Sequence, residues 1–281
     1  MNRIFILSAI GASALLVQNT EANLLFSDGF NYTSGTDLGT SPTSPTWTAT
    51  ATPSSFLAIG SSDLTYAGAP DPGGNSLVMT QGAAGLPAYA SLGTSITSGS
   101  VYYSFLIDCT TAPTASSYLT SLTSSTTPQP NGVSSDALAV YGHAGSSGST
   151  WELGIRIDGS SATFDPTALN VGQSYLAVVE YTFNGAAPTA ALYVDPTPGG
   201  TQPGTANVAL TGTEAAADPN ISNVGFKAQT SLDGDYIFND VNVGTTFTDV
   251  DPGVSAVPEP SSLALASLGA LSLGLLRRFR R

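Results

Sequence analysis

Hydrophobic and polar residues alternate with a period of two along several segments of the 281-residue chain. In the clearest segment, 151–158, every second residue is large and apolar while most of the others are polar or small. This pattern predicts a strand with one buried and one solvated face. Segment 174–184 is largely apolar on both sides, which predicts a central strand. The other expected strands are 24–30, 76–80, 100–109, 118–123, 137–142, 190–194, 221–227 and 235–243.

Turn signals, and not helical patterns, separate these segments. Dipeptides such as Asn184-Gly185 and Asp233-Gly234 are typical of tight turns between strands. No apolar stripe of helical spacing extends over three turns within residues 23–256, which are rich in Ser, Thr, Gly and Ala. We therefore expect one all-β domain, a two-sheet antiparallel sandwich or jelly roll. Two polar segments that contain prolines, 40–55 and 111–135, are expected to be long surface loops.

The end of the chain, residues 257–281, combines three features in a fixed order. Pro258, Glu259 and Pro260 form an extended segment, because each proline fixes φ and disfavours helix in the residue before it. The uncharged residues 261–276 predict a transmembrane helix of about 24 Å, which is short for a hydrocarbon core of about 30 Å. The closing basic cluster is expected to stay in the cytoplasm. It consists of Arg277, Arg278, Arg280 and Arg281.

This order of parts resembles the PEP-CTERM sorting signal, and the resemblance covers residues 257–281 alone. It implies that the protein is exported and then cut near the motif by a membrane protease called exosortase. Pro258, Glu259 and Pro260 would be the recognition element. The alternative is an ordinary membrane anchor whose prolines belong to a linker.

The beginning of the chain agrees with export. Arg3 precedes an apolar stretch over residues 4–17, and Thr20-Glu21-Ala22 offers a cleavage site. Residues 1–22 are therefore expected to be a helical secretory signal peptide, read by the translocon and removed by signal peptidase. The body, residues 23–256, would be held transiently at the inner membrane of a Gram-negative bacterium and then reach the cell surface or extracellular space.

The charge of the body excludes one class of partner. Without Glu21 and Glu259, eighteen acidic residues face only two basic ones, Arg156 and Lys227, which gives a formal charge of −16. Such a surface repels phosphate backbones, so nucleic acid is not an expected partner. The single cysteine, Cys109, cannot form an internal disulfide and is expected to be a buried, inert thiol.

Four short sequence segments are spread over most of the body. They are 25–32, 104–106, 191–196 and 240–246. These phrases look like those of concanavalin-type, laminin-G-like sandwiches, which are found in many proteins with this tail. The resemblance implies a curved two-sheet jelly roll whose concave face can hold glycans.

Catalytic patterns are weak in this sequence. Glycan-cutting enzymes of that fold commonly use a Glu-x-Asp-x-x-Glu strand, and no glutamate here has an acid two residues further on. The sole histidine, His143, has no Gly-x-Ser-x-Gly partner motif and is interpreted as a solvated loop residue. One cysteine and one histidine cannot close a zinc site.

Two groups remain as candidate binding residues. Asp233, Asp235 and Asp240 could offer hard oxygen donors to calcium, although Asp and Gly before a strand more commonly form a turn. Trp47 could stack on a sugar ring if it is exposed, and otherwise pins its loop to the sandwich.

Three functions follow from these patterns. The first is a non-catalytic exported protein of the cell surface or extracellular matrix, associated with exopolysaccharide. The second is a calcium-assisted, lectin-like carbohydrate-binding module. The third is a divergent glycan hydrolase.

Overall fold

The computed structural model describes residues 24–39, 46–49, 57–70, 73–80, 86–126, 136–157, 160–185, 187–212, 220–228, 233–251 and 253. The expected signal peptide, 1–22, and the sorting signal, 257–281, lie outside these residues. Within the described part, no helix has both the length and the apolar character needed to cross a bilayer.

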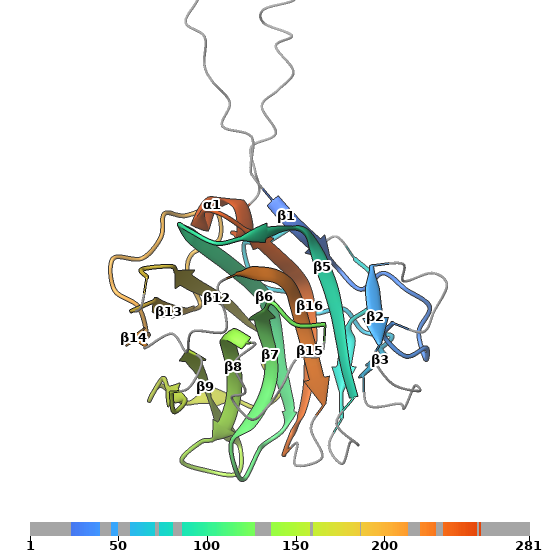
Figure 1. Ribbon diagram of the computed structural model, residues 1–281. Coiled ribbons are helices and arrows are strands. Elements are labelled where there is room, and N and C mark those ends of the chain that lie inside the picture. The colour runs from blue at the N-terminus through green and yellow to red at the C-terminus, as the bar shows by residue number, and fades with distance from the viewer. Residues whose placement is uncertain are drawn as a thin grey trace, which may run out of the picture.

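The described residues form two antiparallel sheets of eight strands each that pack face to face (Figure 1). The first sheet runs in the order β14 (Val208–Thr211), β13 (Thr189–Val194), β12 (Tyr175–Thr182), β6 (Ser100–Thr111), β16 (Asp235–Gly244), β4 (Leu77–Met79) and β3 (Leu57–Ile59), with β1 (Leu24–Asp28) also paired to β16. The second runs in the order β10 (Thr163–Phe164), β9 (Thr150–Ile157), β8 (Asp136–Ala144), β7 (Ser117–Thr123), β15 (Ile221–Ala228), β5 (Leu86–Ile96) and β2 (Trp47–Ala49), with β11 (Leu169–Asn170) also paired to β9. The predicted all-β, two-sheet sandwich is confirmed.

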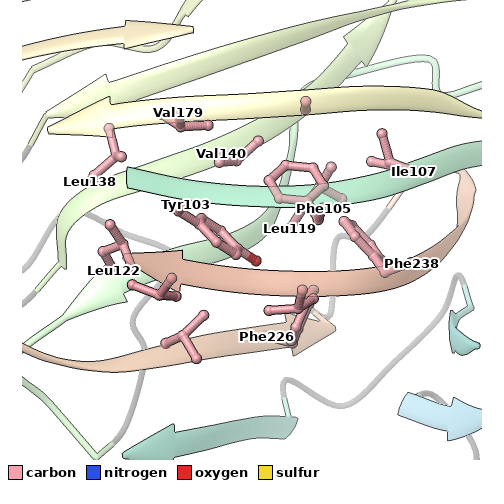
Figure 2. Close-up of a cluster of buried hydrophobic side chains, with 14 of the residues drawn as sticks. Tyr103, Phe105, Ile107, Leu119, Leu122, Leu138, Val140, Val179, Phe226 and Phe238 are labelled. Atoms are coloured by element: carbon pink, nitrogen blue, oxygen red, sulfur yellow. The ribbon is translucent and has the colours of Figure 1, made fainter. Parts of the chain in front are cut away.

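The core lies between the two sheets and follows the period-two alternation. Strand β9 sends Trp151, Leu153 and Ile155 into the core with no exposed surface, while Arg156 is directed away from it. Figure 2 shows Tyr103 and Phe105 meeting side chains from both sheets. Strand β12 pairs with both β6 and β13, as its predicted central position requires.

The prediction of two long surface loops was only partly right. Segment 111–135 contains β7, in which every residue is buried. Its hydroxyl groups are buried because they have partners: Thr120 donates to the carbonyl of Gly225 at 2.8 Å and contacts the hydroxyl of Tyr103 at 2.7 Å. Segment 40–55 contains β2, which pairs with β5. Strand β5 itself gave no clear sequence signal, because its inward side chains include the small residues Ala88 and Ala90.

A second hydrophobic cluster covers the outer side of the first sheet. A short helix, α1 (Phe247–Val250), packs Phe247 and Val250 on this side, where Phe247 contacts the ring of Tyr102 edge-on at 6.3 Å. Strand β1 pairs with the end of β16 that precedes α1, and Leu24 lies opposite Gly244. The first and last described elements are therefore at the same end of the sandwich (Figure 1).

Candidate functional site

The predicted sorting residues, Pro258, Glu259 and Pro260, and the basic residues Arg277, Arg278, Arg280 and Arg281 lie outside the described residues. The last described residue, Gly253, packs so closely against Gly199 that an added Cβ would lie 1.9 Å from its Cα.

Trp47 is not an exposed platform for a sugar, so that reading of the residue is wrong. Its side chain is 3% exposed and packs against Phe26, Phe30 and Phe226, with ring centroids 5.5–5.9 Å apart. Its indole Nε1 donates to Oδ2 of Asp28 at 2.5 Å. The alternative reading, a pin that fixes its segment to the sandwich, is confirmed.

Asp233, Asp235 and Asp240 do not form a metal site. No group of three or more His, Cys, Asp or Glu side chains in the described ranges could hold a metal ion. Asp233 accepts from the backbone N–H and hydroxyl of Thr114 at 2.7 and 2.5 Å, and Asp235 accepts from the hydroxyl of Thr111 at 2.8 Å. Asp240 follows on β16, roughly 15 Å from Asp235 at the rise of a strand. The first two carboxylates thus tie β6 and the segment after it to the turn before β16.

His143 lies on β8 and not in a solvated loop, which corrects the sequence interpretation. Its Nδ1 is 3.5 Å from Oε2 of Glu152 on the neighbouring strand, and its ring lies 4.6 Å from the ring of Phe164. Its side chain is 37% exposed. Nothing in this arrangement places a nucleophile beside the imidazole.

Cys109 is a buried thiol, as predicted. It has no exposed surface, and its Sγ donates to the carbonyl of Thr111 at 3.1 Å. Burial, with a smaller contribution from the charge of Asp108, raises the pKa of the Cys109 thiol to about 12. The thiolate, which is the reactive form, is therefore almost absent at neutral pH.

This burial predicts slow alkylation of Cys109. In the folded protein at pH 8, iodoacetamide should modify the thiol at least 100-fold more slowly than in 8 M urea, because reaction requires opening of the sandwich. Mass spectrometry of timed samples measures both rates. A native rate within tenfold of the rate in urea would mean that the β6 edge of the core is open to solvent.

The site that sequence reasoning missed is on the outer side of the second sheet. We call it the Arg156–Lys227 face, and it includes Asp136, Tyr118 and Tyr141 with the two cations. Arg156 alternates with core residues on β9, and Lys227 alternates with core residues on β15, so both side chains are directed away from the core. They are the only basic residues of the body.

An aromatic pair and a carboxylate lie between the two cations. The Cζ atom of Arg156 lies 5.3 Å from the centroid of the Tyr141 ring, and Tyr118 contacts that ring edge-on at 5.6 Å. Asp136, 3% exposed, accepts a long hydrogen bond of 3.4 Å from Ser121. Tyr118 and Tyr141 form a small hydrophobic cluster separate from the main core.

Burial sets the electrostatics of this face. It lowers the pKa of Lys227, and the nearby charge of Asp136 offsets part of that shift. Burial raises the pKa of Tyr141 to about 12, against the opposing charge of Arg156. The pKa of Tyr118 is raised strongly by burial and then by the charge of Asp136. At neutral pH the face therefore presents neutral phenols between charged groups.

Several polar atoms of this face have no hydrogen-bond partner. Nε and Nη2 of Arg156 and the hydroxyl of Tyr118 are buried without one among the described residues. The hydroxyl of Tyr118 is near enough to Asp136 and Ser121 for both to affect its pKa, but it makes no bond of normal geometry with them. These atoms are also shielded from solvent, so each missing hydrogen bond costs free energy in the folded state.

A pocket of about 740 Å³ lies on the outer side of the first sheet. Its lining includes Tyr102, Gln202 and Phe247 together with glycines and threonines. Beside it, Glu180 accepts from Tyr102 and from Gln202, each at 2.8 Å. Since this carboxylate is already held by protein donors, the network fixes the pocket wall and the carboxylate itself offers little to a ligand.

The fold and these sites define an all-β, two-sheet sandwich with a charged outer face, and solved structures resemble it only distantly. The globular domain of T. cruzi calreticulin is 15% identical with a TM-score of 0.49, over 89% of this chain and 98% of that one. A Trypanosoma rangeli sialidase is 13% identical with a TM-score of 0.41, over 70% of this chain and 29% of its own. A carbohydrate esterase from Shiga toxin-encoding bacteriophage phi24B is 12% identical with a TM-score of 0.44, over 79% and 98%. None of these similarities supports a functional argument.

The sorting signal gives the specific identification. Residues 256–281 match the PEP-CTERM protein-sorting motif, which confirms the resemblance drawn from the sequence. A search of curated proteins finds no sequence that matches this chain. The chain therefore carries a PEP-CTERM sorting signal behind a β-sandwich body.

Proposed function

We propose that this protein is a non-catalytic sandwich, exported by its signal peptide, cut by an exosortase at Pro258-Glu259-Pro260 and delivered to the cell surface or extracellular matrix. The observation that carries the proposal is the complete sorting motif at residues 256–281. Association with exopolysaccharide is the proposed role of the delivered body.

The absence of catalysis is part of the proposal. Nδ1 of His143 contacts Oε2 of Glu152 at 3.5 Å, and a carboxylate beside an imidazole without a bonded nucleophile does not make a catalytic triad. Glu180 is held by tyrosine and glutamine donors, and no second carboxylate is paired with it. General acid and base pairs need two such groups aimed at one site. We also propose that the sandwich is a concanavalin-type jelly roll, as the sequence phrases suggest.

Carbohydrate binding without calcium is the second candidate. The Arg156–Lys227 face favours it, because cations and tyrosines lie together on one side of the sheet. A glycan hydrolase would instead require release of reducing sugar from a polysaccharide substrate.

Replacing Pro258, Glu259 and Pro260 by alanines tests the sorting proposal. In cells that make exosortase, the variant should stay uncut and membrane-bound, because alanines remove the extended segment that a protease cleft can hold. Immunoblots of membrane and culture fractions, with the C-terminus of the product read by mass spectrometry, measure cleavage.

A matched control replaces three residues of similar sequence character elsewhere, Pro196, Thr197 and Pro198, by alanines. Cleavage of this control should equal that of the wild type. If the motif variant were cut and released at the wild-type rate, Pro258-Glu259-Pro260 would not be the recognition element and the proposal would fail.

A further inference from the structure

We propose that the pocket beside α1 binds an uncharged segment of a glycan, with the side-chain carbonyl of Gln202 and the hydroxyls of Thr201 and Thr248 as its hydrogen-bonding groups. We call it the Gln202 pocket. It lies on the outer side of the first sheet, whereas the Arg156–Lys227 face is on the outer side of the second. The inference rests on the proposed function only in that export brings the pocket into contact with extracellular glycans.

The lining of this pocket is uncharged, although the body around it carries eighteen acidic residues and two basic ones. It consists of one glutamine, two aromatic residues, two glycines and five serine or threonine residues. Burial, and then the hydrogen bond to Glu180, raises the pKa of Tyr102, so its phenol is neutral as well. The body repels an anionic ligand, and a cation would lose hydration without a carboxylate in the lining to contact. The pocket therefore favours an uncharged ligand.

The volume and the mixed lining of the pocket fit a short stretch of sugar residues. Its volume of about 740 Å³ is within the range of roughly 300–1,000 Å³ that small-molecule sites have. Only small parts of Tyr102 and Phe247 reach the pocket, since these residues are 8% and 5% exposed. They offer apolar contact to C–H groups, while the surrounding hydroxyls offer hydrogen bonds. A sugar ring presents both kinds of group.

Hydrogen bonds behind the pocket wall hold the amide of Gln202 in one orientation. Its Nε2 donates to Oε2 of Glu180 at 2.8 Å and to the hydroxyl of Tyr193 at 2.7 Å, which uses both N–H groups. Its Oε1 accepts a long bond of 3.2 Å from Tyr102, whose hydroxyl also donates to Glu180 at 2.8 Å. A carbonyl oxygen has two lone pairs, so Oε1 has capacity for a sugar hydroxyl. This acceptor is positioned before a ligand arrives, which lowers the entropy lost on binding.

The hydroxyls of Thr201 and Thr248 belong to exposed residues of the lining. Ser100, in contrast, is already bonded to the hydroxyl of Thr182 at 2.7 Å. Each exposed hydroxyl can donate one hydrogen bond and accept others, which matches the hydroxyls of a sugar. Solvent bonded to these groups is displaced when sugar hydroxyls take its place.

A polypeptide partner that adds a strand is disfavoured at this place. Tyr102 of β6 pairs with Glu180 of β12 on one side and with Gly244 of β16 on the other, so β6 has no free edge beside the pocket. Strand addition requires such an edge. A ligand of the pocket is therefore held by side chains and not by a backbone ladder.

Calorimetry with uncharged oligosaccharides tests the inference. The full-length chain, in a detergent without a sugar headgroup, is titrated with cellohexaose, mannohexaose, xylohexaose and maltohexaose. At least one of them should bind with a Kd below about 1 mM. Its affinity should change by less than about twofold between about 20 and 500 mM salt, because no charges are paired. Polygalacturonate should bind at least about tenfold more weakly, because the body repels it.

Matched variants separate the pocket from the rest of the surface. Thr201→Trp fills the pocket from an exposed position and should weaken binding at least about tenfold. Thr167→Trp makes the same change at an exposed position between β10 and β11, in the second sheet, and should leave the affinity unchanged. Gln202→Met keeps the length of the side chain and removes the amide, so binding should weaken about fivefold, the usual effect of one hydrogen bond. Circular dichroism and urea unfolding confirm that the variants are folded.

Any of four results would overturn the inference. They are no binding of any of the four oligosaccharides, affinity that falls steeply with salt, an equal loss in Thr201→Trp and Thr167→Trp, and wild-type affinity in Gln202→Met. The processing assay on Pro258-Glu259-Pro260 reads the sorting proposal separately. Normal cleavage without oligosaccharide binding would reject the pocket as a glycan site and retain the sorting function.

Discussion

Trp47→Ala is expected to lower the free energy of unfolding by about 3–5 kcal/mol, the usual cost of removing a large aromatic from a core. The indole contacts Phe26, Phe30 and Phe226, so its removal opens a cavity between β1 and the second sheet. It also removes a hydrogen bond to Asp28, which additionally accepts from Tyr32 and from the backbone N–H of Phe30. Urea unfolding measures the change in the free energy of unfolding. It is followed by far-ultraviolet circular dichroism, because tryptophan fluorescence differs between the two proteins.

Trp47→Phe is the matched control because it keeps most of the ring contacts and removes the N–H donor. Its loss should be roughly half that of Trp47→Ala. Combining Trp47→Phe with Asp28→Asn gives a double-mutant cycle for the hydrogen bond. A loss below about 1 kcal/mol for Trp47→Ala would mean that the indole is not packed as the structure has it.

Alternation located most of the long strands because the two-fold period is a local property of the chain. Strands β6, β9 and β12 place mostly large apolar residues at every second position on the core side, and β16 does so on either side of a bulge. Alternation did not predict strand β5, because alanines occupy inward positions of this strand. Alanine gives little contrast in hydrophobicity between the two faces of a strand. Short strands such as β10, with two residues, are below what any period can resolve.

Composition gave a wrong prediction for a strand whose polar side chains are buried with hydrogen-bond partners. Strand β7 is rich in serine and threonine, which favours a loop on composition alone. In the fold, Ser117 donates to the carbonyl of Asp233 and accepts from its N–H, while Thr120 bonds to Gly225. These partners come from strands or turns more than 100 residues away, so no local reading of the sequence could supply them.

The Arg156–Lys227 face depends on topology in the same way. The sequence shows that the body has two bases, but they are 71 residues apart in the chain. Only the order β9-β8-β7-β15 brings them to one side of a sheet, on either side of Tyr141 and Tyr118. A useful signal was nevertheless present, since each base stands at an outward position of an alternating strand. The sorting motif, in contrast, is a contiguous pattern and could be read directly.

Alkaline unfolding near pH 11 is expected from the buried acids of the core. Burial raises the pKa of Cys109 and of Tyr141 to about 12, and raises those of Tyr103, Tyr118 and Tyr236 further. A folded pKa above the unfolded one means that stability is complete below about pH 9 and falls as pH rises toward the folded values. Each such group removes about 1.4 kcal/mol per pH unit once it is ionised in the unfolded chain alone.

Five groups acting together would remove up to about 7 kcal/mol per pH unit, comparable to the whole stability of an ordinary domain. Circular dichroism at 218 nm and phenolate absorbance at 295 nm should therefore change together, in one transition. Tyr103→Phe should move the midpoint to higher pH, because it removes one of these groups at the cost of the bond to Thr120. Phenolate absorbance from all the tyrosines well below the unfolding transition would contradict the burial on which the expectation depends.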